Sequence, residues 1–422
     1  MIATIWALVG FLPALFTQTA NSLQLAAAYD KATAQHPLGR QVALLEESAA
    51  LQLDQIDAGR LPLISLRGNA RLQSENVKIP FQIPGEEPFE LPLFIAQTYV
   101  DAQYLIYDGG ASKARRQKAR RRLLAEQQSV AVELAALKEQ VNQPFFHILR
   151  LRARQKVLLT TLADLGAKLR QLEAGRRHGT VLERDVDQLR IEMLRLESAL
   201  QQLRGQLSAA FATLSDLTGE AIDTSTELRL PDLSDFSLSD TWRRPELKHF
   251  ALQQEHVLAS EDLIVAERRP ILNAFAQGGF GYPNPLNFFD DNFSPYAMVG
   301  LRFQWKLFDW NKTRLDRQLI SVQSQLIENQ RAAFEHNLNI QEARFQEELS
   351  TLEGVIQRDQ TILALQERIR KTASAQLDQG VITTAEYLDH LNDSIRAALE
   401  LETHRLELQQ LKVNYLTLKG FL

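Results

Sequence analysis

Residues 182–219 read LERDVDQLRIEMLRLESALQQLRGQLSAAFATLSDLTG, and this stretch decides the fold. Apolar residues recur in it every seven positions, in two parallel series. One series is Leu182, Leu189, Leu196, Leu203, Ala210 and Leu217, and the other is Val186, Met193, Leu200, Leu207 and Leu214. A seam sustained over about five heptads is typical of a long helix in a coiled coil. We therefore predict a long helix here with a partner helix along its apolar side.

The chain contains two copies of one plan, 201 residues apart. The matched stretches are Tyr107-Asp108-Gly109-Gly110 with Phe308-Asp309-Trp310-Asn311, Gly179 with Gly380, and Leu217-Thr218-Gly219 with Leu418-Lys419-Gly420. Upstream, Ala58-Gly59-Arg60-Leu61-Pro62 resembles Ala266-Glu267-Arg268-Arg269-Pro270 at a separation of 208, and the difference of seven residues falls in the longer loop of the first copy. Matches in one order at a fixed separation indicate an internal repeat. We predict a first repeat over 23–219 and a second over 220–422, each with a helix, a β-hairpin and long helices.

Two segments, 63–107 and 271–308, alternate apolar and polar residues as half-buried strands do. One face of each hairpin is apolar. The other carries polar side chains, among them Arg67, Arg71, Asp101, Gln103, Arg302, Gln304 and Lys306. In an outer-membrane barrel the apolar face meets lipid and the polar face lines the lumen. Trp305, Trp310, Tyr104, Tyr107, Phe303 and Phe308 fit an aromatic girdle, although ordinary strand propensity explains them nearly as well.

The first 22 residues carry no charge, are largely apolar, and end in the small residues Ala20-Asn21-Ser22. This pattern predicts a secretory signal peptide over 1–22. No later run is long and apolar enough for a membrane-spanning helix, so a membrane segment would have to be made of β-strands. Four strands cannot close a barrel, because the smallest such barrels have about eight. We therefore expect a barrel shared between chains, twelve-stranded if three chains each give four strands.

The long helices of each repeat are separated by a short break at Gly179 or Gly380. A threonine follows each break, with glutamate three residues later: Thr180 with Glu183, and Thr383 with Glu386. That spacing predicts a capping box at the start of the second helix. The breaks are therefore expected to be sharp turns between antiparallel helices.

Composition excludes several classes of protein. The 422 residues hold 47 Lys and Arg against 52 Asp and Glu, for a net charge of −5, which does not favour nucleic-acid binding. Cysteine is absent, which excludes disulfides, a thiol nucleophile and cysteine-based zinc sites. The eight histidines have no ligand spacing, so we expect no metal. The sequence also has no glycine-rich phosphate loop and no G-x-S-x-G motif, so we expect no cofactor and no enzyme. The basic run over 113–122 suits a membrane interface or a solvated helix face better than nucleic acid.

In this arrangement the sequence resembles the TolC family of outer-membrane efflux proteins. The resemblance rests on the duplicated order, on Gly179 and Gly380 with an acid six residues on, and on the Leu-x-Gly helix ends at Gly219 and Gly420. It covers nearly all of residues 23–422. It implies an α+β membrane protein with an internal twofold repeat, in which a long helical coiled-coil barrel joins a shared 12-stranded transmembrane β-barrel. The implied protein is a homotrimer that lies in outer-membrane lipid and spans the periplasm.

The resemblance also implies a function. Such a protein is the passive exit duct of a tripartite efflux or type I secretion system, docked to a periplasmic adaptor and an inner-membrane pump. Asp185, Glu386 and Asp389 match acids at the family's periplasmic entrance, while an acid in a first helical turn is equally expected from capping alone. The aromatic and basic partners of that entrance are replaced here by Leu377 and Ile382. The turns expected to meet the adaptor hold Gly179, Thr180, Val181, Gly380, Val381 and Ile382.

Two alternatives to a channel remain. A periplasmic coiled-coil scaffold without a pore explains the heptads but leaves the four alternating strands unexplained. An enzyme with a helical dimer interface lacks any catalytic constellation in the sequence. Solubility separates these classes, since buffer extracts a scaffold or an enzyme while a channel needs detergent.

Overall fold

The computed structural model describes residues 22–75, 92–233, 236–239, 241–287, 290 and 292–422. The predicted signal peptide at 1–22 lies outside the described residues except for Ser22. The chain divides into two compact units, which we describe separately. The first holds Met1–Gly39, Glu133–Arg244 and His336–Leu422, and the second holds Arg40–Val132 and Pro245–Glu335.

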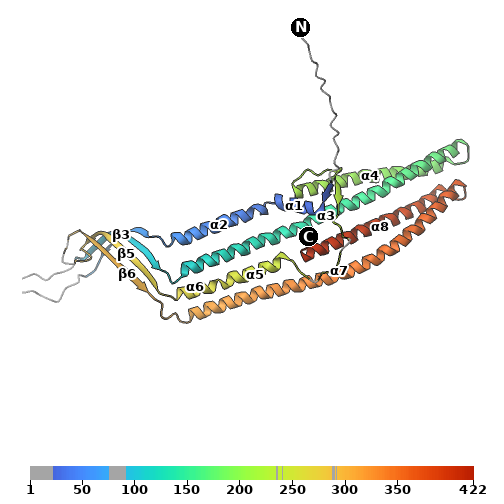
Figure 1. The fold of residues 1–422 in the computed structure, drawn as a ribbon. Helices are drawn as coiled ribbons and strands as arrows, with labels where there is room; N and C mark the ends of the chain where they lie inside the picture. The colour runs from blue at the N-terminus through green and yellow to red at the C-terminus, as the bar shows by residue number, and fades with distance from the viewer. Residues whose placement is uncertain (1–21, 76–91, 234–235, 240, 288–289, 291) are drawn as a thin grey trace, which may run out of the picture. The chain divides into compact units, whose positions relative to one another are not determined.

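Four long helices dominate the chain, and they repeat with the predicted separation. Helix α3 (Ala111–Arg177) and helix α7 (Lys312–Asp378) each have 67 residues. Helix α4 (Glu183–Thr218) and helix α8 (Thr384–Lys419) each have 36 residues. All four begin and end 201 residues from their counterpart. In the first unit, α3 turns back into α4 and α7 turns back into α8, as two helical hairpins (Figure 1).

The heptad seam of α4 is buried, as the sequence predicts. Val186, Leu189, Leu196, Leu200, Leu203, Leu207 and Leu214 are all less than 9% exposed. Near the helix–helix turns, α4 packs with Leu158, Leu165 and Leu172 of α3 and with Tyr387, Leu388 and Leu391 of α8. Farther from the turns, α4 and α3 pack with α1 (Leu25–Gln35) around Phe145, Phe146 and Phe211. The seam therefore holds both repeats together within this unit.

Short elements complete the first unit. Strand β1 (Ser22–Gln24) pairs in parallel with β4 (Glu227–Arg229), which joins the start of the described chain to the connection between the repeats. Lys419 near the end of α8 is fully buried. Its Nζ lies 2.6 Å from a carboxylate oxygen of Glu342 and 3.7 Å from the centre of the Trp242 ring. These contacts fix the segment between the repeats to the end of α8.

The second unit contains a four-stranded antiparallel sheet. Its strands are β2 (Leu63–Leu72), β3 (Phe94–Tyr107), β5 (Ile271–Tyr282) and β6 (Ser294–Gln304), in the order β2-β3-β5-β6. Each repeat gives one hairpin, and β3 pairs with β5 to join them. The second hairpin is shorter than predicted, because β6 ends at Gln304 rather than near Phe308. The unit also holds α5 (Pro245–Leu258), α6 (Ser260–Glu267), most of α2 (Leu38–Ala58) and the first parts of α3 and α7.

Within the described residues, no helix combines the length and the apolar character needed to cross a membrane.

Candidate functional site

The turn between α7 and α8 has the predicted capping box. Thr383 is the N-cap of α8; its Oγ1 accepts a hydrogen bond from the backbone N of Glu386 at 3.3 Å, and its own backbone N donates to Glu386 Oε2 at 2.8 Å. The hydrogen bond from the Thr383 backbone holds the pKa of Glu386 below its ordinary value. Capping thus engages Oε2 of this carboxylate and leaves the side chain at the surface.

Asp389 lies one turn beyond Glu386 on α8. Both side chains are exposed, while Tyr387, Leu388 and Leu391 on the other side of the helix are buried. Residues three apart on a helix share a face, so the two acids form one exposed acidic face of α8. No capping contact involves Asp389, which leaves its carboxylate available to solvent or to ions.

The corresponding turn of the first repeat differs from the prediction. Helix α4 begins at Glu183 with Leu182 as its N-cap, and no side chain caps it. Thr180 Oγ1 instead donates to the carbonyl of Gly175 at 3.0 Å, at the end of α3. The predicted Thr180–Glu183 capping box is therefore wrong, because Thr180 stands two residues before the N-cap. The position equivalent to Thr383 is Leu182, which has no hydroxyl.

Asp185 is the first-repeat counterpart of Glu386, since both stand at the third helical position. Its backbone N donates to Leu182 O at 3.1 Å, and its carboxylate lies 3.6 Å from the Arg184 guanidinium. The side chain is 17% exposed, unlike the exposed Glu386. The two repeats therefore place an acid at the same helical position but in different surroundings.

Both helix–helix turns depend on a glycine in the left-handed region, with φ +74° at Gly179 and +69° at Gly380. The following backbone N–H groups reach back to the preceding helix, from Thr180 to Gly175 O at 3.0 Å and from Val381 to Gln376 O at 2.8 Å. This is the pattern of a glycine-terminated helix end. The apolar side chains of Leu182 and Val381 remain 62% and 65% exposed beside these turns. Each turn thus presents a rigid backbone with an uncovered apolar residue.

A polar cluster behind the turns joins the two repeats, and it was not among the predicted site residues. Lys168 of α3 is 7% exposed, and its Nζ lies 2.6 Å from Asp378 Oδ1 and donates to Ser374 Oγ at 3.0 Å. Gln171 Nε2 donates to the same carboxylate at 2.7 Å. The sequence contained a signal for this cluster. Leu158, Leu165 and Leu172 recur every seven residues, and the polar residues Thr161 and Lys168 recur with the same spacing beside them.

The register of the sheet places six of the seven predicted lumen residues on one face. Directly paired residues share a face, and the pairs Arg67–Tyr99, Asp101–Gln277, Gln103–Phe275 and Asn273–Arg302 connect all four strands. By alternation, Arg67, Arg71, Asp101, Gln103, Arg302 and Gln304 lie together on this polar face. The register does not extend to Lys306, because this residue follows the last strand residue, Gln304.

Asp101 is the centre of the polar face. Its carboxylate accepts hydrogen bonds from Gln103 Nε2 at 2.8 Å and Gln277 Nε2 at 3.0 Å, and lies 3.3 Å from Arg67. Arg302 lies over the Phe275 ring at 5.4 Å. Gln277 was not among the predicted residues, although its alternation with Asn273 and Phe275 contained the signal. The network gives the face fixed charges and hydrogen-bonding groups.

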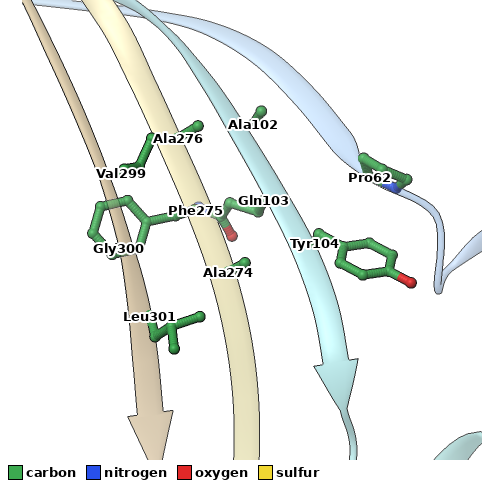
Figure 2. Close-up of a pocket in the computed structure, with 10 residues that line it drawn as sticks. All are labelled: Pro62, Ala102, Gln103, Tyr104, Ala274, Phe275, Ala276, Val299, Gly300 and Leu301. Carbon is green, nitrogen blue, oxygen red and sulfur yellow. The ribbon is translucent and has the colours of Figure 1, made fainter.

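The opposite face of the sheet is apolar and uncovered in the described chain. Its side chains include Leu66, Val299 and Leu301, which are 77%, 83% and 67% exposed. Figure 2 shows a groove on the sheet, with a volume of about 480 Å³. Alanines of two neighbouring strands, Ala102, Ala274 and Ala276, form its floor between Tyr104 and Pro62 on one side and Val299 and Leu301 on the other. The sheet is therefore two-sided, with a charged face and an apolar face.

No group of three or more His, Asp or Glu residues in the described parts of the chain has a geometry suited to a metal ion.

The sequence and the fold were compared with known protein families and solved structures. A family model described as "Outer membrane efflux protein" matches residues 28–220. The chain is similar in structure to the outer membrane protein VceC from Vibrio cholerae, with TM-score 0.64, 15% identity and coverage of 94% of this chain and 96% of that one. It is also similar to the CmeC outer membrane channel of Campylobacter jejuni, with TM-score 0.63, 14% identity and coverage of 94% and 85%.

A third similar structure is the open state of the MtrE outer membrane channel of Neisseria gonorrhoeae, with TM-score 0.62, 13% identity and coverage of 94% and 88%. At these identities the likeness concerns the fold. A search of curated proteins finds no match. The long helical hairpins joined to a small sheet are thus the fold of outer-membrane channels.

Proposed function

We propose that the chain is a member of the outer membrane efflux protein family, whose model matches residues 28–220, and that it is the passive exit duct of a tripartite efflux or type I secretion system. In this proposal three copies assemble. Each gives four strands to a shared 12-stranded barrel in outer-membrane lipid, and the long helices form a duct in the periplasm. The proposal includes no catalytic step and no cofactor, because the partner pump supplies the energy.

The two-sided sheet is the observation that carries the proposal. A sheet with one exposed apolar face cannot remain in water without a cover, and the described chain provides none over Leu66, Val299 and Leu301. Lipid satisfies that face, while water in a lumen satisfies the charged groups around Asp101. Arg67, Arg71, Asp101, Gln103, Arg302 and Gln304 are then lumen residues.

The edges of the sheet support the sharing of a barrel between copies. Strands β2 and β6 are the outer strands in the order β2-β3-β5-β6, and each pairs on one side only in the described chain. Unpaired backbone groups are costly in lipid, so an open sheet must be completed. If β2 of each copy pairs with β6 of the next copy, both edges of every sheet are paired.

The helix–helix turns are suited to docking of a periplasmic adaptor. Gly179, Thr180, Val181, Gly380, Val381 and Ile382 form two similar turns, next to which Leu182 and Val381 are exposed. An apolar residue on a rigid turn offers a contact that needs little ordering on binding. Replacing Val381 with Asp should abolish export in cells while trimers remain intact. Retained export would contradict this docking surface.

Glu386, Asp389 and Asp185 are the entrance residues of the proposal. Three copies of each acidic face would gather charge where the turns meet, and such rings attract cations. The proposed duct is tested by conductance in planar lipid bilayers. Wild-type protein should give discrete conductance steps that trivalent cations block from the turn side, and the Glu386→Ala/Asp389→Ala variant should lose this block.

Asp393→Ala is the matched control, because Asp393 lies one turn farther along α8 and already faces Arg396 at 3.8 Å. It should keep the block. Absence of any conductance from detergent-extracted protein would refute the channel and favour the scaffold without a pore. Conductance with unchanged block in the double variant would instead refute the entrance assignment alone.

A further inference from the structure

A second hollow of the sheet unit lies where β6 leads into α7. It has a volume of about 350 Å³, and the residues that line it include Arg268, Asp309, Thr313, Arg314, Arg317 and Gln318. Three guanidinium groups therefore surround one small hollow. We call this hollow the arginine pocket.

The arginine pocket has an excess of positive charge, with three arginines and one carboxylate in its lining. In the parts of the chain that the structure describes, Arg268, Arg314 and Arg317 form no salt bridge of 4.0 Å or less, and all three are exposed. The carboxylate of Asp309 offsets part of this charge through its Coulombic interaction with Arg268, while its Oδ2 accepts hydrogen bonds from the backbone N of Thr313 at 3.1 Å and from the Thr313 hydroxyl. Three arginines with unused N–H donors are suited to an anionic group with several oxygens, such as a phosphate.

The internal repeat provides a natural comparison. Arg60, Lys113 and Arg116 occupy the positions equivalent to Arg268, Arg314 and Arg317, in the same order along the chain. In the first repeat, however, Arg116 forms a salt bridge with Asp57. The position equivalent to Asp57 is Val265, which cannot neutralise Arg317. The second copy thus keeps the basic set while lacking the acid that satisfies the first copy.

The surroundings of the pocket are those of a membrane interface. Trp305 Nε1 donates to the backbone carbonyl of Arg268 at 3.0 Å. Phe308 and Trp310 are 71% and 84% exposed, and their rings meet edge to face at 4.8 Å. Exposed aromatic rings gather at the level of lipid headgroups, so Trp305, Phe308 and Trp310 mark this level.

The alanine-floored groove of Figure 2 is close to the arginine pocket along the strands. Ala274 follows Arg268 by six residues and Leu301 precedes Trp305 by four, so about 20 Å or less of extended chain separates groove and pocket. The hydrocarbon half of a bilayer is roughly 15 Å thick. One lipid molecule can therefore reach both places.

From these observations we propose that the arginine pocket and the groove form a binding site for an anionic phospholipid. Its phosphate is held by Arg268, Arg314 and Arg317, and one of its acyl chains lies over Ala102, Ala274 and Ala276. The proposal rests on the outer-membrane function proposed above, because it requires the apolar face to be in lipid. The occupant is a membrane lipid and not a free phosphate, because the groove gives apolar contact that a free anion would not use.

Quenching of tryptophan fluorescence by brominated lipids tests the site. Trp305 and Trp310 lie beside it, Trp242→Phe removes one tryptophan of the other unit, and Trp6 lies in the predicted signal peptide. Protein in this background is reconstituted into vesicles of phosphatidylcholine with a small fraction of brominated phosphatidylglycerol. A second sample has the bromine on phosphatidylcholine in the same mixture. Quenching should be several times stronger with brominated phosphatidylglycerol, beyond its share of the lipid.

Two pocket variants make the result specific. Replacing Arg314 and Arg317 with Gln should lower the preference for the anionic lipid about fivefold per arginine, the effect of one cationic residue at a charged surface. Val265→Asp keeps all three arginines and restores the acid of the first repeat, so it should also lower the preference. Arg331→Gln, on α7 but in a salt bridge with Glu335, should leave it unchanged.

The outcomes separate the two proposals. Equal quenching by both brominated lipids overturns the lipid site, as does a preference that persists in both pocket variants. Loss of the preference on adding inorganic phosphate at millimolar concentration would show a site for a free anion and would also overturn the proposal. Conductance is recorded from the same vesicles, so a channel without lipid preference refutes the site alone, and failure to insert refutes the channel.

Discussion

Gly179 and Gly380 end two 67-residue helices in the same left-handed backbone conformation. A Cβ added at either position would meet nothing within 4 Å. Any cost of a larger residue at these turns must therefore come from the backbone and not from packing.

Replacing Gly380 with Ala should destabilise the protein by about 1 kcal/mol, because a left-handed conformation costs an L-residue roughly that much. Gly205 is the control, since it lies inside α4 with open space around it and an ordinary helical conformation. Gly205→Ala should stabilise by about 0.5–1 kcal/mol. Denaturant unfolding measures the change in the free energy of unfolding for each variant. If both variants were less stable than wild type, the cost at Gly380 could not be assigned to its left-handed backbone conformation.

The carboxylate of Glu386 gives a pH-dependent contribution to stability. Its pKa in the folded protein is lowered from an ordinary value of 4.5 by the Thr383 backbone hydrogen bond. The unfolded chain thus binds the proton more tightly, so stability is full above the unfolded-state pKa and is lost as pH falls through the folded-state pKa. The melting temperature should fall less between about pH 6 and about pH 3 in Glu386→Gln than in wild type. Equal slopes would contradict the capping contribution.

The threonines near the turns show what a residue pattern can and cannot predict. The spacing Thr-x-x-Glu occurs in both repeats, and it forms a capping box only at Thr383. The pattern does not contain the position at which a helix begins, and this position decides whether Thr180 or Leu182 is the N-cap. Thr383→Ala should cost about 1 kcal/mol, whereas Thr180→Ala should cost less. Chemical denaturation compares the two, and equal costs would contradict the assigned N-caps.

At the scale of elements, α3 and α7 meet near the turns through an ion pair whose lysine is buried and whose aspartate is exposed. Lys168 is 7% exposed, and Asp378 satisfies its charge together with Ser374. The helices themselves were predictable because the same order of long helices and glycine breaks recurs in both repeats. Their contact was not, because a single chain's periodicity does not reveal which residue of another helix faces a buried lysine.

Removing the aspartate charge of this pair should destabilise the protein more than removing the lysine charge. Asp378→Asn leaves Lys168 buried with weaker acceptors and should cost about 1–3 kcal/mol. Lys168→Met replaces the charge with an apolar chain of similar length and should cost less or stabilise. Unfolding of both single variants and of the double variant measures the coupling. A larger loss in Lys168→Met would show that packing of the lysine stem dominates.

The ends of the strands show a second limit at this scale. Alternation continues from Val299 to Leu307 in the sequence, yet β6 ends at Gln304. Alternation of apolar and polar residues indicates which side chains of a strand are buried. It does not indicate where the strand ends, because a strand ends where its hydrogen-bonded partner ends. Ile271 is the first residue of β5 and pairs with Gln304, so no partner remains for Trp305 or Lys306.

At the scale of the whole molecule, the internal repeat allowed the fold to be predicted. One separation of 201 residues gave the order of hairpins and long helices, which the structure reproduces in the lengths of four helices. The pairing of β3 with β5, which joins the repeats into one sheet, follows from no local pattern. The arginine pocket likewise needed the structure, because Arg268 and Arg317 are far apart along the chain.

The two faces of the sheet should respond differently to charge when the protein enters a membrane. Leu301→Lys on the apolar face should cost up to about 2–4 kcal/mol, as for a cation near the middle of a bilayer. Gln304→Lys on the polar face should have little effect. The yield of folded protein in phosphatidylcholine vesicles, measured by resistance to protease, compares the two variants. Equal yields would contradict a lipid-facing apolar face.

The matched lengths of the helical hairpins restrict how such a chain can tolerate insertions and deletions. Loss of one residue from α4 alone would rotate everything beyond it by 100° and shift it by 1.5 Å, which takes its seam out of register with α3. Loss of seven residues restores the register but shortens one arm by about 10.5 Å. Only coordinated loss of a heptad from both helices of a hairpin keeps seam and turn together. Shortening only one of the two helical hairpins would leave hairpins of unequal length in every copy. Viable length variants should therefore differ by multiples of seven residues, and the change should occur in both repeats.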